Sequence, residues 1–259
     1  MSWVKATTVS LLIAHLAMWT GIAGAAHAQS FDAAVATLRT TEVYPGKNAL
    51  FEAAVLKIIE ATRQTAPDSG FATQVAAFGP GSTYYSLSFY DKFSDVKPEP
   101  LLAEAFGQEE AARIVAMFAE SVKSTRVQAF IPRPDLSRPN ELGDFEVVWT
   151  VVITVNPGMA AQYERYLEQL VEATEKVDSD RHWFAYAPSA GSANTFRIAI
   201  PMKWTDLDSS DMSIAERLTK AFGERKSQSI QESRRAAVAH VETLLTIRRP
   251  DLSYQPDTD

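Results

Sequence analysis

The sequence predicts an α+β protein made of two tandem copies of one β-α-β-β-α-β unit. The pentapeptide Arg-Pro-Asp-Leu-Ser occurs twice, at residues 133–137 and 249–253. The match extends back without a gap to Ala105 and Ala221, and 11 of the 33 aligned positions are identical. Strand-like and helix-like segments also follow the same order in both halves. Repetition of a whole unit predicts two domains of one topology.

The second copy shows its elements most clearly. Residues 145–155 are rich in β-branched and aromatic side chains, which favour strands, and a turn-forming Asn-Pro-Gly follows them. From Tyr163 to Ala173, apolar residues recur every three or four positions, which is typical of an amphipathic helix. The elements predicted for this copy are strand 145–155, helix 163–173, strands 182–187 and 195–201, a long helix that ends near His240, and strand 243–247.

The first copy repeats this order, with matching segments 111 to 116 residues earlier in the chain. The change of offset from 111 to 116 places five additional residues of the second copy between its third strand and its second helix. A loop accepts such an insertion most readily. We therefore expect repeat 1 at residues 29–139, a linker at 140–144 and repeat 2 at 145–259. Each repeat is long enough to bury a modest core.

Residues 1–28 predict a cleavable secretory signal peptide. Lys5 precedes an apolar run, and the segment ends in the small-residue pattern Ala-His-Ala at 26–28. His15 and Thr20 interrupt the run, which argues against a retained membrane anchor. We expect a periplasmic or secreted protein.

Composition excludes several classes of function. The formal net charge is -7 and no run of Lys or Arg occurs, so neither nucleic acid nor an anionic membrane is an expected partner. The chain has no cysteine, which excludes a thiol nucleophile and a thiolate metal site. No spaced set of histidines and carboxylates predicts another kind of metal site. The expected partner is a small molecule, and the oligomeric state stays open.

The predicted topology leads to a family resemblance. A β-α-β-β-α-β unit forms an antiparallel sheet with both helices on one face. The strand at 147–153 is apolar on both sides, so its other face also needs a cover, which the second copy can supply. By element order and duplication, the chain resembles the dimeric α/β-barrel superfamily, a ferredoxin-like group that includes antibiotic-biosynthesis monooxygenases. The resemblance implies a pseudo-dimeric barrel with a ligand cavity between the two sheets, and no particular reaction.

Strand alternation predicts which side chains face this cavity. Residues 85, 87 and 89 align with Phe196, Ile198 and Ile200 at an offset of 111, and this apolar set is expected to face the helices. Arginines in a cavity need a partner, and a ligand anion is one candidate. The alternative is that they reach the barrel rim or pair with carboxylates of the protein. The residues expected to bind the ligand are Arg39, Tyr84, Ser86, Tyr90, Trp149, Trp183 and Arg197.

Two histidines are the candidate catalytic residues. His182 precedes Trp183 in a predicted strand and is a candidate general base toward an aromatic substrate. His240 is predicted late in a helix, and in haem-handling members of the resembled superfamily a histidine on a comparable helix is an iron ligand. An ordinary surface histidine is the alternative for His240. We expect no cofactor from the residues themselves, and haem is the alternative that the resemblance adds.

The repeated pentapeptide is predicted to be structural, because proline ends a strand ladder and the residues that follow can bond nearby backbone. We expect Arg133 to pair with Asp135, and Arg249 with Asp251, so that each pair holds the tail of its copy against the neighbouring copy.

The sequence leaves four functions open. The first is an exported protein that binds a small aromatic or anionic molecule. The second is a cofactor-independent monooxygenase-like enzyme, and the third is a haem-binding barrel protein. The fourth is a structural or interaction module whose cavity is filled by its own side chains.

Overall fold

The structure is a computed structural model that describes residues 33–79, 82–96, 101–139, 144–191, 194–208 and 212–256. The predicted signal peptide and residues 140–143 of the predicted linker lie outside these ranges. Among the helices in these ranges, none is long and apolar enough to cross a membrane.

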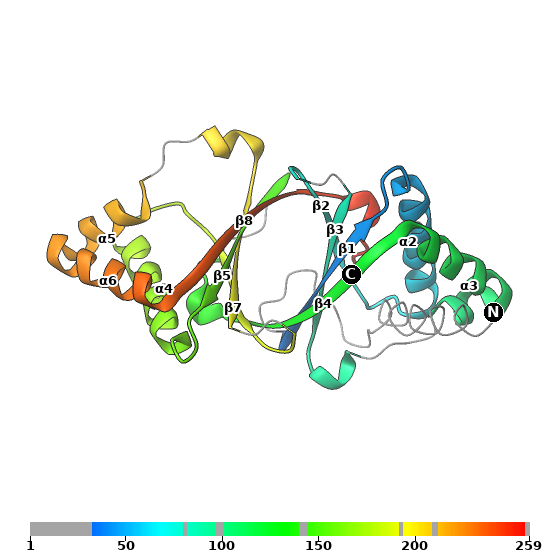
Figure 1. The fold of residues 1–259 in the computed structure, drawn as a ribbon, viewed down its shortest axis with the longest axis horizontal. Helices are drawn as coiled ribbons and strands as arrows, with labels where there is room; N and C mark the ends of the chain where they lie inside the picture. Colours follow the sequence, from blue (N-terminus) through cyan, green and yellow to red (C-terminus); the bar gives the residue numbers. More distant parts are fainter. Residues whose placement is uncertain are drawn as a thin grey trace, which may run out of the picture. The chain divides into compact units, whose positions relative to one another are not determined.

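Both repeats have the predicted β-α-β-β-α-β order (Figure 1). The first repeat consists of β1 (Val35–Val43), α2 (Asn48–Thr65), β2 (Ala72–Ala76), β3 (Thr83–Tyr90), α3 (Leu101–Ser121) and β4 (Val122–Pro132). The second consists of β5 (Val147–Val155), α4 (Ala160–Lys176), β6 (Phe184–Pro188), β7 (Thr195–Met202), α5 (Ile214–Phe222), α6 (Glu224–Ala237) and β8 (Val238–Arg248). The eight strands follow the order β1-β3-β2-β8-β5-β7-β6-β4, which is that of a closed barrel. The predicted α+β fold is confirmed.

The second helical segment of each repeat bends at an equivalent glycine. Gly107 (φ +78°) interrupts α3, and Gly223 (φ +79°) separates α5 from α6. Glycine adopts positive φ readily because it has no Cβ. The prediction of one long helix in repeat 2 is corrected to two helices, since the backbone at Gly223 is not helical.

The last strand of repeat 2 begins earlier than predicted. Helix α6 ends at Ala237 and β8 starts at Val238, so His240 lies in a strand. Strand β8 pairs with β5 over nearly its whole length, with His240 opposite Thr154. Such pairing outweighs the local helical preference of the segment. The helical placement of His240 is therefore wrong.

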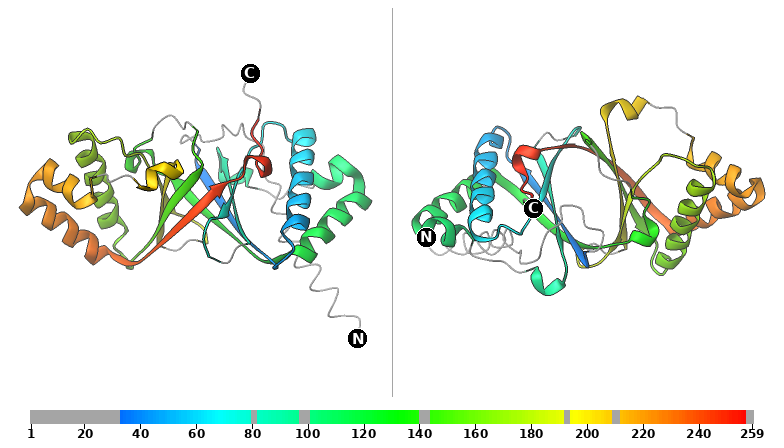
Figure 2. Two further views of the ribbon diagram at one scale, coloured as in Figure 1. Left: turned by 90° about the horizontal axis from the view of Figure 1, so that it is seen from above. Right: turned by 180° about the vertical axis from the view of Figure 1, so that it is seen from behind.

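The chain divides into two compact units that exchange their ends. The first unit contains the residues up to 128 together with the segment from Arg248, and the second contains residues 129–247. The residues that follow β4 thus belong to the second unit, and those that follow β8 belong to the first. Within the first unit, α2 and α3 pack side by side, and within the second, α4 packs against both α5 and α6 (Figure 2).

Each unit has its own core beneath its helices. In the first unit, Phe51 of α2 packs against Tyr84 of β3 with ring centroids 4.6 Å apart, and against Phe118 of α3 at 5.8 Å. In the second unit, Tyr163 of α4 packs against Phe196 of β7 at 5.0 Å. The residues of each equivalent pair are 112 apart in the sequence, so the two cores follow one plan.

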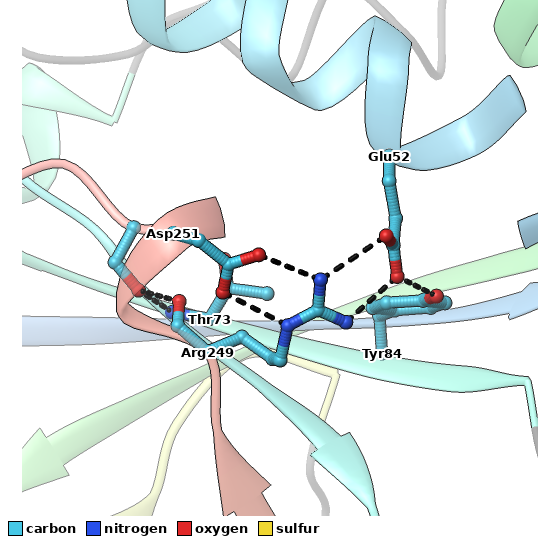
Figure 3. A network of polar contacts seen from close by, with 6 residues as sticks. Glu52, Thr73, Tyr84, Arg249 and Asp251 are labelled. Carbon is cyan, nitrogen blue, oxygen red and sulfur yellow. Dashed lines mark hydrogen bonds and ion pairs between the residues drawn. The ribbon is translucent and has the colours of Figure 1, made fainter. Parts of the chain in front are cut away.

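The pentapeptide after β8 fastens the end of the chain to α2 (Figure 3). Arg249 donates to the two carboxylate oxygens of Asp251 at 2.9 and 2.7 Å, and to those of Glu52 at 2.7 and 3.1 Å. Tyr84 donates its hydroxyl to the same Glu52 at 2.6 Å. Charge-assisted bonds in this bidentate form are among the strongest polar contacts in proteins. We call this network the first clasp.

The pentapeptide after β4 forms the equivalent second clasp. Arg133 donates to Asp135 at 2.9 and 2.7 Å and to Glu164 of α4 at 2.7 Å. In each clasp the serine of the pentapeptide, Ser137 or Ser253, accepts a strand backbone N–H at 2.8 Å. The two predicted Arg–Asp pairs are confirmed, and glutamates of α2 and α4 complete them.

Candidate functional site

A pocket of about 320 Å³ lies inside the second unit, between its strands and its helices. Its floor is the helix-facing side of the sheet, formed by Val151 of β5 with Ile198 and Ile200 of β7. Tyr163 and Tyr166 of α4 form one wall. Ile214, at the start of α5, also lines the pocket and is 41% exposed, so the pocket reaches the surface. This lining suits an apolar molecule.

Three arginines complete the pocket, and none of its described lining residues is acidic. Arg217 of α5 is only 7% exposed, and its Nη1 lies 3.5 Å from Thr174 Oγ1. Arg234 of α6 places its guanidinium over the ring of Tyr166, 5.6 Å from the centroid. Arg181 lines the pocket from the segment that precedes β6. The pocket therefore joins an apolar floor to a cationic wall.

The local sequence fixes the position of Arg217. Helix α5 begins with a capping box, in which Ser213 accepts from the backbone N–H of Glu216 while Glu216 accepts from that of Ser213. Such a box satisfies two backbone donors at the helix start and fixes the entry of the chain. Arg217 follows directly, in the first turn of the helix, and points into the unit.

The two helix arginines act on one tyrosine. Burial raises the pKa of Tyr166, and Arg234 and Arg217 both oppose this rise. A cation lowers the pKa of a phenol only from close range, because the interaction weakens with distance. Both guanidinium groups therefore interact with Tyr166. Two cations that line one partly open pocket can bind one anionic group together.

His182 and Trp183 lie side by side at the edge of the pocket. Trp183 is 4% exposed and donates its indole N–H to the carbonyl of Leu136 at 2.9 Å. Nδ1 of His182 is buried and has no hydrogen-bond partner among the described residues. Strand β6 begins at Phe184, so the predicted strand start at 182 is two residues too early. Both residues lie at a pocket within one unit, and the role of His182 as a general base stays a prediction.

The equivalent positions of repeat 1 are built differently. Leu101 and Phe118, 116 residues before Arg217 and Arg234, are 1% and 0% exposed and belong to the packed core region of the first unit. Trp183 corresponds to Phe71, because both make the isolated bridge to the segment after a pentapeptide. His182 therefore corresponds to Gly70.

Four of the predicted ligand residues share one face of the first unit, but it is the face toward the helices. In the β1–β3 pair, Arg39 lies opposite Ser86, and Tyr84 and Tyr90 alternate on the same side. Tyr84 packs against Phe51 of α2, which shows that this side faces the helix. The predicted facing is therefore wrong for repeat 1. The strands align at an offset of 112 and not 111, and a slip of one residue moves every side chain to the other face.

Arg39 is the charged residue among these four, and it is buried. It is 7% exposed, and burial lowers its pKa to about 10, although Tyr90 opposes the change. Tyr90 is also 7% exposed. Arg39 corresponds to Val151 in the floor of the second-unit pocket, at an offset of 112. In each unit, arginine side chains thus lie between the sheet and the helices. In the first unit the arginine comes from the sheet, and in the second unit arginines come from the helices.

The remaining predicted ligand residues separate within the second unit. Trp183 lines the pocket, whereas Trp149 is 39% exposed and is not among the lining residues. Arg197 lies between Phe196 and Ile198 in β7, and so points to the face away from the pocket. Its guanidinium lies over the ring of Phe130, 5.3 Å from the centroid. Their roles in ligand binding stay predictions.

The described residues do not fit the alternative of haem ligation by His240. His240 lies on β8, is exposed, and is not on a helix as the resemblance requires. Within the described ranges, no group of three or more His, Cys, Asp or Glu residues is placed to hold a metal ion.

Sequence reasoning missed Arg181, Arg217 and Arg234. A signal was present, because Arg217 and Arg234 align with Leu101 and Phe118 at the offset of the pentapeptide. A charge that replaces an apolar residue at a core position of a duplicated unit indicates that the core is open there.

Known structures share the fold of this chain, although no protein-family model and no curated protein matches it. A monooxygenase-like protein from Lactobacillus acidophilus NCFM superposes with a TM-score of 0.52 at 9% identity, over 83% of this chain and 94% of that one. One from Fusobacterium nucleatum gives 0.50 at 12% identity, over 83% and 92%. A variant of chlorite dismutase from Candidatus Nitrospira defluvii in complex with cyanide gives 0.51 at 10%, over 84% and 92%.

At these identities the similarity concerns the fold alone. It agrees with the duplicated β-α-β-β-α-β order, the strand order and the equivalent cores of the two units. The chain therefore has the ferredoxin-like fold of the dimeric α/β-barrel proteins.

Proposed function

We propose that the pocket of the second unit binds a small molecule with an apolar body and an anionic group, such as an aromatic carboxylate. The observation that carries the proposal is the combination of an apolar floor with three arginines and no acidic residue in the described lining. A site of this composition attracts an anion and gives its hydrocarbon part a surface to bury.

The arginines favour a planar anion. A guanidinium presents two parallel N–H donors, and a carboxylate has two acceptor oxygens at matching positions. Arg217 is almost fully buried, and Arg234 lies over the ring of Tyr166 in the same pocket. A charge-assisted bond in a low-dielectric pocket is stronger than the same bond at the surface. These features support a carboxylate between the two helix arginines.

The volume limits the size of the ligand. About 320 Å³ lies at the lower end of the range of small-molecule sites, roughly 300–1,000 Å³. The tyrosine rings of α4 and the indole of Trp183 offer surfaces for an aromatic ring. We therefore propose a ligand of one or two rings. The cavity predicted between the two repeats stays a prediction.

The test compares the wild type with a variant that carries the residues of repeat 1. 2-Naphthoate has two rings and one carboxylate, and isothermal titration reports its binding. The wild type is expected to bind it, and R217L/R234F to lose at least about a hundredfold in affinity, because two charge-assisted bonds disappear and Leu and Phe fill the space. Arg235 is exposed on the same helix, so R235F is a matched control and is expected to bind like the wild type.

Two results would count against this function. One is a wild type that binds neither 2-naphthoate nor benzoate, and the other is unchanged binding in R217L/R234F.

A monooxygenase-like reaction is the second candidate, and His182 is the observation that favours it. The imidazole lies at an apolar pocket beside Trp183, which is a suitable place for a general base that acts on an aromatic hydroxyl group. The fold shared with monooxygenase-like proteins is consistent with it. Oxygen-dependent turnover of a naphthalenediol, lost in H182F, is the expected outcome. Equal turnover in H182F would remove His182 from the reaction.

The proposed function includes export of the protein from the cytoplasm. Residues 1–28 support a periplasmic or secreted location for the binding protein. Expression of the full chain followed by cell fractionation and mass determination tests it, and a mature protein that begins near Gln29 outside the cytoplasm is expected. Retention of Met1 in the cytoplasmic fraction would contradict it.

A further inference from the structure

We infer that His182 selects ligands that carry a hydroxyl group in addition to the anionic group, through a hydrogen bond to Nδ1. The inference rests on the proposed function, since it names a second recognised group on the same ligand. It assigns His182 to specificity, and the arginines to the anion.

The imidazole of His182 has an unsatisfied nitrogen. Nδ1 is buried and no described residue hydrogen-bonds to it. A buried polar atom without a partner is destabilising, and such atoms are rare in native proteins unless a ligand or water completes them. His182 is one of the lining residues, so its ring borders the pocket. The pocket therefore holds a recognition group for a polar part of its ligand.

The fold does not require a histidine at this position. The indole N–H of the adjacent Trp183 is satisfied by the carbonyl of Leu136, and this contact anchors the segment without His182. The equivalent residue of repeat 1 is Gly70, which has no side chain. A ring that the fold does not need, placed at a pocket with an unsatisfied nitrogen, points to a role in binding.

The chemistry of the imidazole indicates which polar group it binds. A neutral imidazole has one nitrogen that donates and one that accepts, and Nδ1 takes either part according to the tautomer. A hydroxyl group both donates and accepts, so it satisfies Nδ1 in either tautomer. The carboxylate is the natural partner of Arg217 and Arg234, whose guanidinium groups only donate. The chemistry points to hydroxylated aromatic carboxylates.

The test measures selectivity rather than affinity alone. The probes are 2-naphthoate and its 5-, 6- and 7-hydroxy derivatives, which vary the direction of the hydroxyl group while the carboxylate stays in place. At least one derivative is expected to bind the wild type about tenfold more tightly than 2-naphthoate does, which corresponds to one hydrogen bond in a buried site. In H182F this advantage is expected to disappear, so that the variant binds 2-naphthoate and its hydroxy derivatives with dissociation constants within about threefold of one another.

The variants separate specificity from folding. H182F keeps a ring of similar shape, and H182G places the residue of repeat 1 at the same position, so loss of selectivity in both, with cooperative thermal unfolding retained, supports the assignment. Equal binding of all four probes by the wild type overturns the inference and leaves the proposed function intact. The same holds if the preference survives in H182F. Failure of the wild type to bind any of the probes overturns the proposed function and the inference together.

Discussion

The two units share a frame and differ in the interior beneath their helices. In the first unit the sheet contributes the polar groups, Arg39 and Ser86, while the helices contribute buried Leu101 and Phe118. In the second unit the sheet is apolar and the helices contribute arginines, which leaves a pocket. The difference shows that a duplicated unit can keep its packing plan while one copy opens its core. A search for function is therefore best directed to the positions where the copies disagree.

The shared frame includes the two clasps. Arg249 pairs with Glu52 of α2, and Arg133 pairs with Glu164 of α4, so each clasp joins an exchanged end to the first helix of a unit. A feature built alike in both units is expected to serve stability. The pocket has no such counterpart, and is expected to serve a ligand. Variants of the clasps and of the two interiors can test these two expectations separately.

The largest effect is expected from placing the arginine of one unit in the core of the other. F118R removes a ring that is 0% exposed and packs on Phe51, and it buries a charge in a filled core. We expect a loss of about 3–5 kcal/mol in the free energy of unfolding, measured by urea denaturation. The reciprocal change R234F is expected to alter stability by less than about 1 kcal/mol, because it fills a pocket. Similar losses in both variants would remove the contrast between the units.

Each clasp is expected to contribute a smaller amount to the free energy of unfolding, and the two amounts are expected to be nearly equal. R249A and R133A each remove a bidentate pair whose arginine side chain is about a quarter exposed, 24% and 23% respectively. After allowance for solvent screening, we expect a loss of about 1–2 kcal/mol in the free energy of unfolding for each. The loss is expected to be greater for R249A, since Glu52 also holds Tyr84. A change of less than about 0.3 kcal/mol in both would show that the clasps are not structural.

Acid is expected to weaken the first clasp. The hydrogen bond from Arg249 is the main cause that lowers the pKa of Glu52 and that of Asp251 in the folded state. A carboxyl group with a lowered folded pKa contributes stability above its unfolded pKa, about 4, and loses it as the pH falls through the folded value. Stability measured by urea denaturation should therefore decrease below about pH 4. R249A is expected to show a shallower decrease, and an identical pH profile would contradict the assignment.

The smallest effect is expected from the tyrosine hydroxyl that the first clasp has and the second lacks. Tyr84 donates to Glu52, whereas Phe196 occupies the equivalent position in the second unit. Y84F removes one hydroxyl and leaves Glu52 bonded to Arg249, so a loss of about 0.5–1 kcal/mol in the free energy of unfolding is expected. The control F196Y adds a hydroxyl near Glu164 and tests whether the second clasp accepts it. A loss above about 2 kcal/mol in Y84F would mean that the hydroxyl has a larger role.

The sequence predicted the topology of both repeats and the Arg–Asp pairs, because periodicity and exact repetition are local signals. It failed on the face of β3, since Tyr84 was aligned one residue away from Phe196 and alternation turns such an error into the opposite side of the sheet. It also placed His240 in a helix, because the pairing of β8 with β5 is not visible in the segment itself. The pocket was missed because Arg181, Arg217 and Arg234 come from separate elements, which only the fold brings together.

The central claim is that the pocket of the second unit recognises an anion. Isothermal titration of 2-naphthoate and of the uncharged, similarly shaped 2-naphthamide tests it most directly in the wild type and in R217L/R234F. The wild type is expected to prefer the carboxylate by at least about a hundredfold, as two charge-assisted bonds allow, and the double variant to lose that preference. Equal affinities for the two compounds in the wild type, or a preference that persists in the double variant, would contradict the claim.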